Sequence, residues 1–117
     1  MLSAALGTAL DIKPVLRCFR GDTGPVAKVK GFEPAVEKLF DFAARRVKAG
    51  LMTPTLTLCY GGRLDEMRAL PGYARLREAC AAQNVEVFES VMSTTGMVNV
   101  GRGAVVVGFA AADHAFD

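Results

Sequence analysis

The chain has 117 residues, of which 51% are hydrophobic and 22% charged, enough to bury one modest core. Its formal net charge is +2, from 14 basic and 12 acidic side chains, which does not suggest the clustered basic stripe of a nucleic-acid-binding domain. The longest apolar runs, such as AVVVGFAAA, fall short of the roughly 20 residues of a membrane span. We therefore expect a single globular domain that neither binds nucleic acid nor spans a membrane.

The cysteine and histidine content bounds the site chemistry. Cys18, Cys59 and Cys80 are widely spaced without a CxxC pair, and His114 is the only histidine. A zinc site of cysteine and histidine needs about four ligands in close spacing, so we expect no metal, and nothing indicates another cofactor. Scattered cysteines are typical of reduced core residues, and the N-terminus lacks the basic region of a signal peptide. We therefore expect a cytoplasmic protein.

The first half of the chain predicts a hairpin followed by a helix. A helical turn is expected at 3–10, strands at 15–19 and 26–30, and a loop of turn-forming residues at 20–25. Glu33-Pro34 opens a helix, since proline is tolerated in a first turn, and Gly50 stands where a C-cap glycine belongs. The helix carries one apolar stripe at helical spacing: Val36, Leu39, Phe40, Ala43 and Val47.

The second half predicts alternating strands and helices. Strands are expected at 53–60, 85–92 and 104–110, and a helical region at 63–82 is interrupted at Pro71-Gly72. Residues 93–103 read as a polar loop. The order is β-β-α-β-α-β-β, and right-handed crossovers would place both helices on one face of a mixed β-sheet. We therefore predict an α/β fold, a two-layer sandwich.

Several local patterns allow two interpretations. Gly101 and Gly103 precede a strand, not a helix, so they do not predict a dinucleotide loop; they serve either tight backbone packing or close approach of a ligand. Lys13 and Lys30 either lay their stems along the sheet or place a charge at a pocket. A polar cluster near residues 90–99 also has two interpretations. It presents hydroxyls and amides to a bound carboxylate or phosphate, or it is a solvated loop. Its members are Ser90, Ser93, Thr94, Thr95 and Asn99.

A small hydrolase that uses Ser93 or Cys59 as its nucleophile is one hypothesis for the function. His114 would have to meet Cys59 or Ser93 through a tertiary contact that no periodicity predicts. We therefore expect a protein that is not an enzyme.

Two motifs resemble a known family. The run LGTALDIKPVL, residues 6–16, resembles the "LGxLLxIKPIL" segment of DegV-type fatty-acid-binding proteins of bacteria. In that family a turn, a "KVR" strand and a helix follow, where this chain has Lys28-Val29-Lys30 and the helix from Pro34. The family's "HxGPGALGV" run is matched by NVGRGAVVVG, residues 99–108.

The resemblance implies a fatty-acid-binding function. DegV proteins are longer two-domain α/β proteins that bind one fatty acid, and some act as the acyl-carrying subunit of a bacterial fatty-acid kinase. Serine and threonine of an N-terminal domain hold the headgroup, and that domain precedes the IKP segment. Residues 1–117 would then be the C-terminal lipid-binding domain alone, without the headgroup domain.

The chain departs from the family pattern at three positions. Asn99 replaces the histidine, Arg102 the proline, and Lys30 the arginine of "KVR". Lysine keeps the charge but loses the bidentate fork of arginine, and asparagine cannot act as a protonated donor. These changes bear more on acyl phosphorylation than on binding of an apolar tail.

We therefore predict a domain that binds a long-chain fatty acid, with a fatty-acid kinase subunit or a second copy as further partners. The alternative is a docking domain that binds no lipid and packs on a missing N-terminal domain, a kinase subunit or itself. Leu10, Ile12, Phe88 and Val91 are the candidates for an apolar pocket wall, although each is equally readable as core. The predicted ligand-binding residues are Asn99, Gly101, Arg102, Gly103, Lys30 and Ile12.

Overall fold

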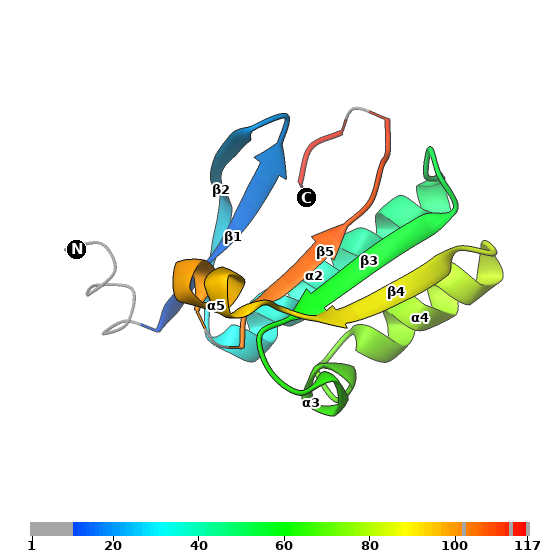
Figure 1. Ribbon diagram of the computed structural model, residues 1–117. Coiled ribbons are helices and arrows are strands. Elements are labelled where there is room, and N and C mark those ends of the chain that lie inside the picture. The colour runs from blue at the N-terminus through cyan, green and yellow to red at the C-terminus, as the bar shows by residue number, and fades with distance from the viewer. Residues whose placement is uncertain (1–10, 102, 113, 117) are drawn as a thin grey trace.

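The computed structural model describes residues 11–101, 103–112 and 114–116, with the backbone alone at 98–100 (Figure 1). The helical turn expected at 3–10 lies outside these residues. Within them, no helix is both long and apolar enough to cross a bilayer. The elements are β1 (Ile12–Phe19), β2 (Asp22–Lys30), α2 (Phe32–Ala49), β3 (Thr55–Tyr60), α3 (Leu64–Arg68), α4 (Tyr73–Ala82), β4 (Glu86–Val91), α5 (Thr94–Val100) and β5 (Val105–Gly108).

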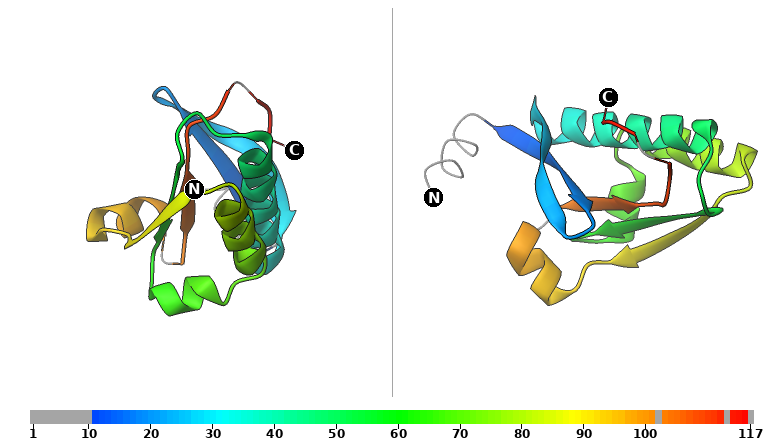
Figure 2. Two further views of the ribbon diagram at one scale, coloured as in Figure 1. Left: turned by 90° about the vertical axis from the view of Figure 1, so that its right-hand side faces the viewer. Right: turned by 90° about the horizontal axis from the view of Figure 1, so that it is seen from above.

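A mixed three-stranded sheet forms one layer, in the order β4-β3-β5. β3 and β4 run parallel and are joined by the crossover through α3 and α4, whereas β5 is antiparallel to β3. Both views in Figure 2 place α2 and α4 on one side of this sheet. The predicted two-layer α/β sandwich is confirmed.

The core lies between these two layers. On α2, Val36, Phe40, Ala43 and Val47 are buried, as the predicted stripe requires, while Leu39 is only partly buried. Opposite them, the alternation of β3 turns its buried side chains toward the helices. These sheet residues are Leu56, Leu58 and Tyr60.

The ends of α2 follow the sequence signals. Gly31 precedes the helix with φ of 89°, and its N–H donates to the carbonyl of Asp11 at 2.8 Å. Gly50 ends the helix with φ of 109°, and its N–H donates to the carbonyls of Arg46 and Val47. The predicted C-cap at Gly50 is therefore confirmed.

The hairpin β1–β2 forms a separate two-stranded sheet, so the mixed sheet contains three of the five strands. The loop expected at 20–25 is wrong: Arg20 and Gly21 alone connect the strands, with φ of 50° and 87°. Positive φ at both central residues matches the twist of a two-residue hairpin turn. The pairing register skips Val26, a bulge that lets the strand continue through Gly24 and Pro25.

The helical region after β3 is divided as predicted. α3 ends at Arg68 and α4 begins at Tyr73, so the interruption at Pro71-Gly72 is confirmed. A Cβ atom at Gly72 would lie only 3.0 Å from the Cβ of Phe40. The lack of a side chain at Gly72 therefore allows the start of α4 to pack close to α2.

The polar loop expected at 93–103 is also wrong, because α5 occupies residues 94–100. Ser93 caps this helix, its Oγ accepting a hydrogen bond from the N–H of Gly96 at 3.0 Å. Figure 2 shows α5 on the side of the sheet away from α2 and α4.

Candidate functional site

A cleft of about 790 Å³ lies between the hairpin and the C-terminal segment and extends onto α2. One wall is the continuous run 15–20, from β1 into the hairpin turn, and the facing wall is the run 107–112, from β5 into the chain beyond it. The remaining lining residues are Val26, Leu39, Phe42, Met52, His114 and Phe116. Its size falls within the range of small-molecule sites.

A second apolar face of α2 contributes to the lining. Leu39 and Phe42 lie three positions apart and line the cleft, whereas Phe40 and Ala43 belong to the core. Phe42 is buried, and so is Val15 on β1. This interior part of the cleft is therefore apolar.

Aromatic rings hold the C-terminal wall in place. The ring of Phe42 lies 4.6 Å from that of Phe116 and 6.3 Å from that of Phe109, measured between centroids. The imidazole of His114 stacks on Phe109 at 5.9 Å, and its Nδ1–H donates to the carbonyl of Ala112 at 2.7 Å. In addition, the N–H of Met52 donates to the carbonyl of Ala110 at 2.8 Å.

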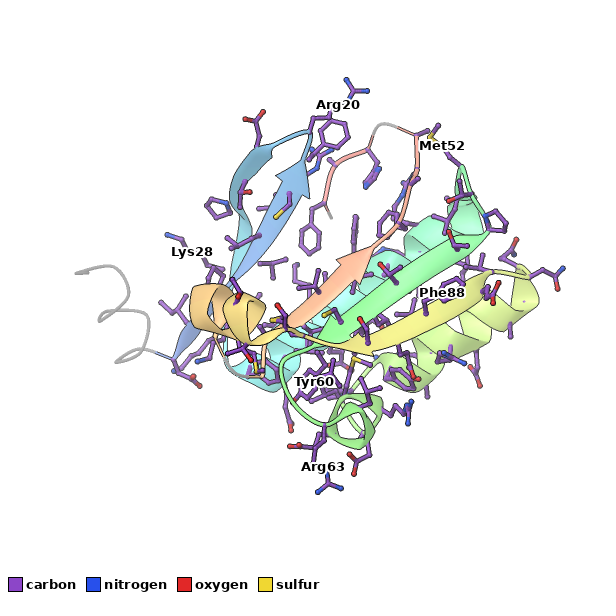
Figure 3. All side chains as sticks on the ribbon, viewed as in Figure 1. Arg20, Lys28, Met52, Tyr60, Arg63 and Phe88 are labelled. Carbon is purple, nitrogen blue, oxygen red and sulfur yellow. The ribbon has the colours of Figure 1, made fainter. Side chains whose placement is uncertain are left out.

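Exposed hydrophobic side chains gather at the mouth of the cleft. Figure 3 shows Arg20 and Met52 at the same edge of the molecule. Among the described residues, seven large hydrophobic side chains are exposed, and four of them line this cleft. These four are Leu16, Phe19, Val26 and Met52, with exposed fractions of 50%, 49%, 38% and 71%.

The hairpin residues predicted from sequence lie away from the cleft. Ile12 and Lys30 face each other in the hairpin register, at the end remote from the Arg20-Gly21 turn. Ile12 is partly buried, Lys30 is exposed, and neither lines the cleft. In the described part of the chain, no hydrogen bond or ion pair joins them to Gly101 or Gly103.

The predicted glycine pair packs against the end of β3. Gly101 and Gly103 have φ of 93° and 77°, a conformation that favours glycine. The N–H of Gly103 donates to the carbonyl of Gly61, and the N–H of Gly61 donates to that of Ala104, both at 3.0 Å. This geometry supports the tight-packing interpretation. Asn99 belongs to α5, but its side chain, Arg102 and Leu10 lie outside the described set.

Two other predicted wall residues lie on β4, outside the cleft. Phe88 pairs with Thr57 on the sheet face turned away from the helices, and is 51% exposed. Val106 on β5 shares that outer face and is 47% exposed. Val91 is exposed at the end of β4. The sequence did not lead us to predict any residue of this cleft as ligand-binding, although the helical spacing of Leu39 and Phe42 was an available signal.

The residues of the hydrolase hypothesis have other partners. His114 contacts aromatic rings, the Oγ of Ser93 caps α5, and Cys59 pairs in register with Ser90 and Val106. Across the described ranges, no three histidine, cysteine or acidic side chains form a metal-binding group.

A partly buried ion-pair cluster lies on the inner side of β4. The Glu89 side chain is 11% exposed, accepts hydrogen bonds from Tyr73 and Arg68, and lies 3.7 Å from Arg77. Burial alone raises the pKa of Glu89, but the hydrogen bonds of Tyr73 and Arg68 and the nearby guanidinium charges outweigh it. The net pKa of Glu89 is therefore lowered.

A comparison with family models decides the relationship. Residues 1–112 match the model described as "Uncharacterised protein, DegV family". The chain belongs to the DegV family. The resemblance seen in the IKP and glycine motifs is thereby confirmed.

Two DegV domain-containing proteins of Xanthomonas are close relatives. One comes from Xanthomonas campestris pv. campestris and the other from Xanthomonas axonopodis pv. citri. Each is 65% identical over 116 residues, which cover 99% of this chain and 37% of the relative. The chain thus spans little more than a third of the length of these DegV relatives.

Proposed function

We propose that the chain binds the hydrocarbon tail of a long-chain fatty acid in the cleft between the hairpin and the C-terminal segment. The observation that carries the proposal is a cleft of about 790 Å³ with an apolar interior and with exposed hydrophobic side chains at its mouth. Membership of the DegV family supports it, because the resemblance in the IKP and glycine motifs implies fatty-acid binding.

The physical basis is removal of apolar surface from water. Burial of each methylene group contributes about 0.8 kcal/mol, and the aromatic walls contribute matching apolar surface. A tail of about ten buried methylenes would gain about 8 kcal/mol before the costs of association. Binding in the micromolar range or tighter needs a net gain of about 8 kcal/mol, so more than about ten methylenes must be buried to offset the cost of association.

In this proposal the chain acts by binding and not by catalysis, and a fatty-acid kinase subunit is the partner implied by the family. The substitutions at Asn99 and Lys30, where the family pattern is altered, would then affect binding of that partner more than binding of the fatty-acid tail.

Native mass spectrometry with added oleate tests the proposal. Replacing Leu16 and Phe19 together by serine removes two residues of the cleft mouth and should weaken oleate retention about tenfold or more. The matched pair is Phe88→Ser with Val106→Ser, which changes side chains of similar exposure on the outer sheet face. The Phe88→Ser/Val106→Ser variant should retain oleate as the wild type does.

Two outcomes would contradict the proposal. Wild-type protein that retains no oleate would show that the cleft does not bind lipid by itself. Loss of oleate in the Phe88/Val106 variant, with retention in the Leu16/Phe19 variant, would instead move the site to the outer sheet face, and Phe88 would then be the pocket-wall residue that the sequence predicted.

A second candidate function rests on that outer face. Phe88 and Val106 lie on a sheet surface that α2 and α4 do not cover, and both are about half exposed. Exposed apolar surface of this kind is typical of a docking site. In this alternative the chain packs on another domain, a kinase subunit or a second copy.

A further inference from the structure

The strand β4 has a free edge. In the described part of the chain it pairs with β3 alone. At its two ends the N–H groups of Glu86 and Met92 donate to carbonyls on the β3 side, so its even-numbered residues direct their backbone groups toward β3. Because backbone groups alternate along a strand, the N–H and C=O groups of Val87 and Glu89 point away from the sheet.

The usual protections of a free strand edge are missing from β4. Folded proteins block such edges with proline, lysine, an inward-pointing charge or a covering segment. The hairpin contains Pro14 and Pro25, whereas β4 reads EVFESV. The inward-pointing charge of β4 is Glu89, which is compensated by Arg68 at 2.7 Å and Arg77 at 3.7 Å. The view from above in Figure 2 places β4 at the margin of the molecule.

The sequence of β4 is complementary to itself in one antiparallel register. Val87 and Glu89 both face outward, so each must pair with an outward-facing residue of a second copy. When Val87 lies opposite Glu89 of the partner subunit, the Phe88 residues of the two copies meet on a two-fold axis. Glu86 then lies opposite Ser90, and no like charges face each other. A shift by one residue in each copy would instead place Glu89 opposite Glu89.

Phe88 supplies the apolar contact in this register. Its side chain is 51% exposed on the outer sheet face. The two Phe88 residues form a non-hydrogen-bonded pair, whose Cα atoms lie about 4.5 Å apart in antiparallel sheets. The two rings therefore lie side by side, and cross-strand aromatic pairs stabilise a sheet.

We propose that two copies of this chain pair antiparallel along β4, with Phe88 on the two-fold axis, and so join their three-stranded sheets into one of six strands. This inference goes beyond the proposed function. The cleft lies beside β5, at the opposite edge of the sheet, so the pairing leaves the clefts of both copies open.

Sedimentation equilibrium of the 117-residue chain and its Val87→Pro variant tests the pairing. Proline removes the outward N–H of Val87 but no hydrogen bond to β3, so the strand itself should persist. The dissociation constant of the dimer should rise about tenfold or more, because each copy loses one hydrogen bond to the other. Val87→Thr is the control: it keeps the N–H and the β-branched shape, and its dissociation constant should stay within about threefold of the wild type.

Amide hydrogen exchange of the wild type, followed residue by residue by NMR, distinguishes edge pairing from packing through the outer face. The amides of Val87 and Glu89 should exchange more slowly in concentrated than in dilute protein. The amide of Phe88 is the internal control, because it faces β3 and should be protected in monomer and dimer alike. This measurement does not depend on the folding of any variant.

Three results would overturn the pairing. One is a wild type that stays monomeric at every concentration. Another is a dimer in which the Val87 and Glu89 amides exchange as fast as in the monomer, since the copies would then meet through the outer face alone. The third is a folded Val87→Pro variant that dimerises as tightly as the wild type. Oleate retention by the Val87→Pro variant should equal that of the wild type, so each proposal can fail without the other.

Discussion

At the scale of single residues, Glu89 joins three elements. Its carboxylate accepts hydrogen bonds from Tyr73 at the start of α4 and from Arg68 at the end of α3, while the strand β4 carries it. Removing one partner of a partly buried charged cluster leaves the others unpaired. Glu89 therefore fixes the crossover between β3 and β4.

The lowered pKa of Glu89 gives a pH prediction. Its ionised form stabilises the fold, so this contribution is present above the unfolded pKa of about 4.3 and is lost as pH falls through the lower folded pKa. Glu89→Gln should reduce the free energy of unfolding by roughly 1–3 kcal/mol at neutral pH. The difference from wild type should shrink as the pH falls below about 4.3.

Urea unfolding across this pH range is the measurement. Glu86→Gln is the control, because Glu86 is an exposed carboxylate on the same strand. Equal unfolding free energies for wild type and Glu89→Gln at neutral pH would contradict the assigned role.

At the scale of elements, Gly61 connects the end of β3 to the turn before β5. A Cβ atom there would lie 3.2 Å from the carbonyl oxygen of Gly101 and 3.2 Å from the nitrogen of Gly103. Both neighbours are backbone atoms of a turn that hydrogen-bonds to Gly61 itself. An added methyl group must therefore displace the turn.

Gly61→Ala should lower the free energy of unfolding by roughly 1–2 kcal/mol through this overpacking. Gly24→Ala is the control: a Cβ at Gly24 meets nothing within 4 Å, so its effect should be neutral or stabilising by less than about 1 kcal/mol. Thermal or urea unfolding of the two variants measures the difference, and equal stabilities would contradict the close approach.

The helices and the hairpin turn differ in how far the sequence predicts them. Helix α2 was predictable because its apolar spacing, Pro34 and Gly50 agree on one element. Helix α5 was not, because Gly96 and Asn99 are poor helix formers and Ser93 also suits a loop. The turn at Arg20-Gly21 was hidden by Gly24 and Pro25, which the bulged strand accommodates.

The candidate site was predictable only in outline. The motifs indicated the family, but Lys30 and Phe88 lie outside the cleft that the fold creates. The cleft depends on residues 107–112, His114 and Phe116 lying opposite β1, a long-range arrangement that no local pattern encodes. Only Leu39 and Phe42, at helical spacing on α2, offered a local sign of it.

At the scale of the whole molecule, neither α2 nor α4 covers the outer sheet face, which is the side on which α5 lies. Phe88 and Val106 are exposed there, and burial of such a surface favours association. We expect the isolated chain to form dimers as its concentration rises, with the Phe88→Ser/Val106→Ser variant remaining monomeric.

Sedimentation velocity over a concentration series measures this association. The Leu16→Ser/Phe19→Ser variant is the matched control and should dimerise like the wild type, since its changes lie at the cleft. A wild type that stays monomeric at every concentration would contradict the use of this face for self-association.

The division into two sheets has a consequence for the order of folding. β1 and β2 are joined by a two-residue turn, whereas Thr57 on β3 bonds to the carbonyl of Gly108 across 51 residues of chain. Local pairings form quickly and distant ones slowly, because the intervening loop must close first. The hairpin wall should form early and the β5 wall late. Because the cleft needs both walls, ligand binding during refolding would begin only after β5 has paired with β3.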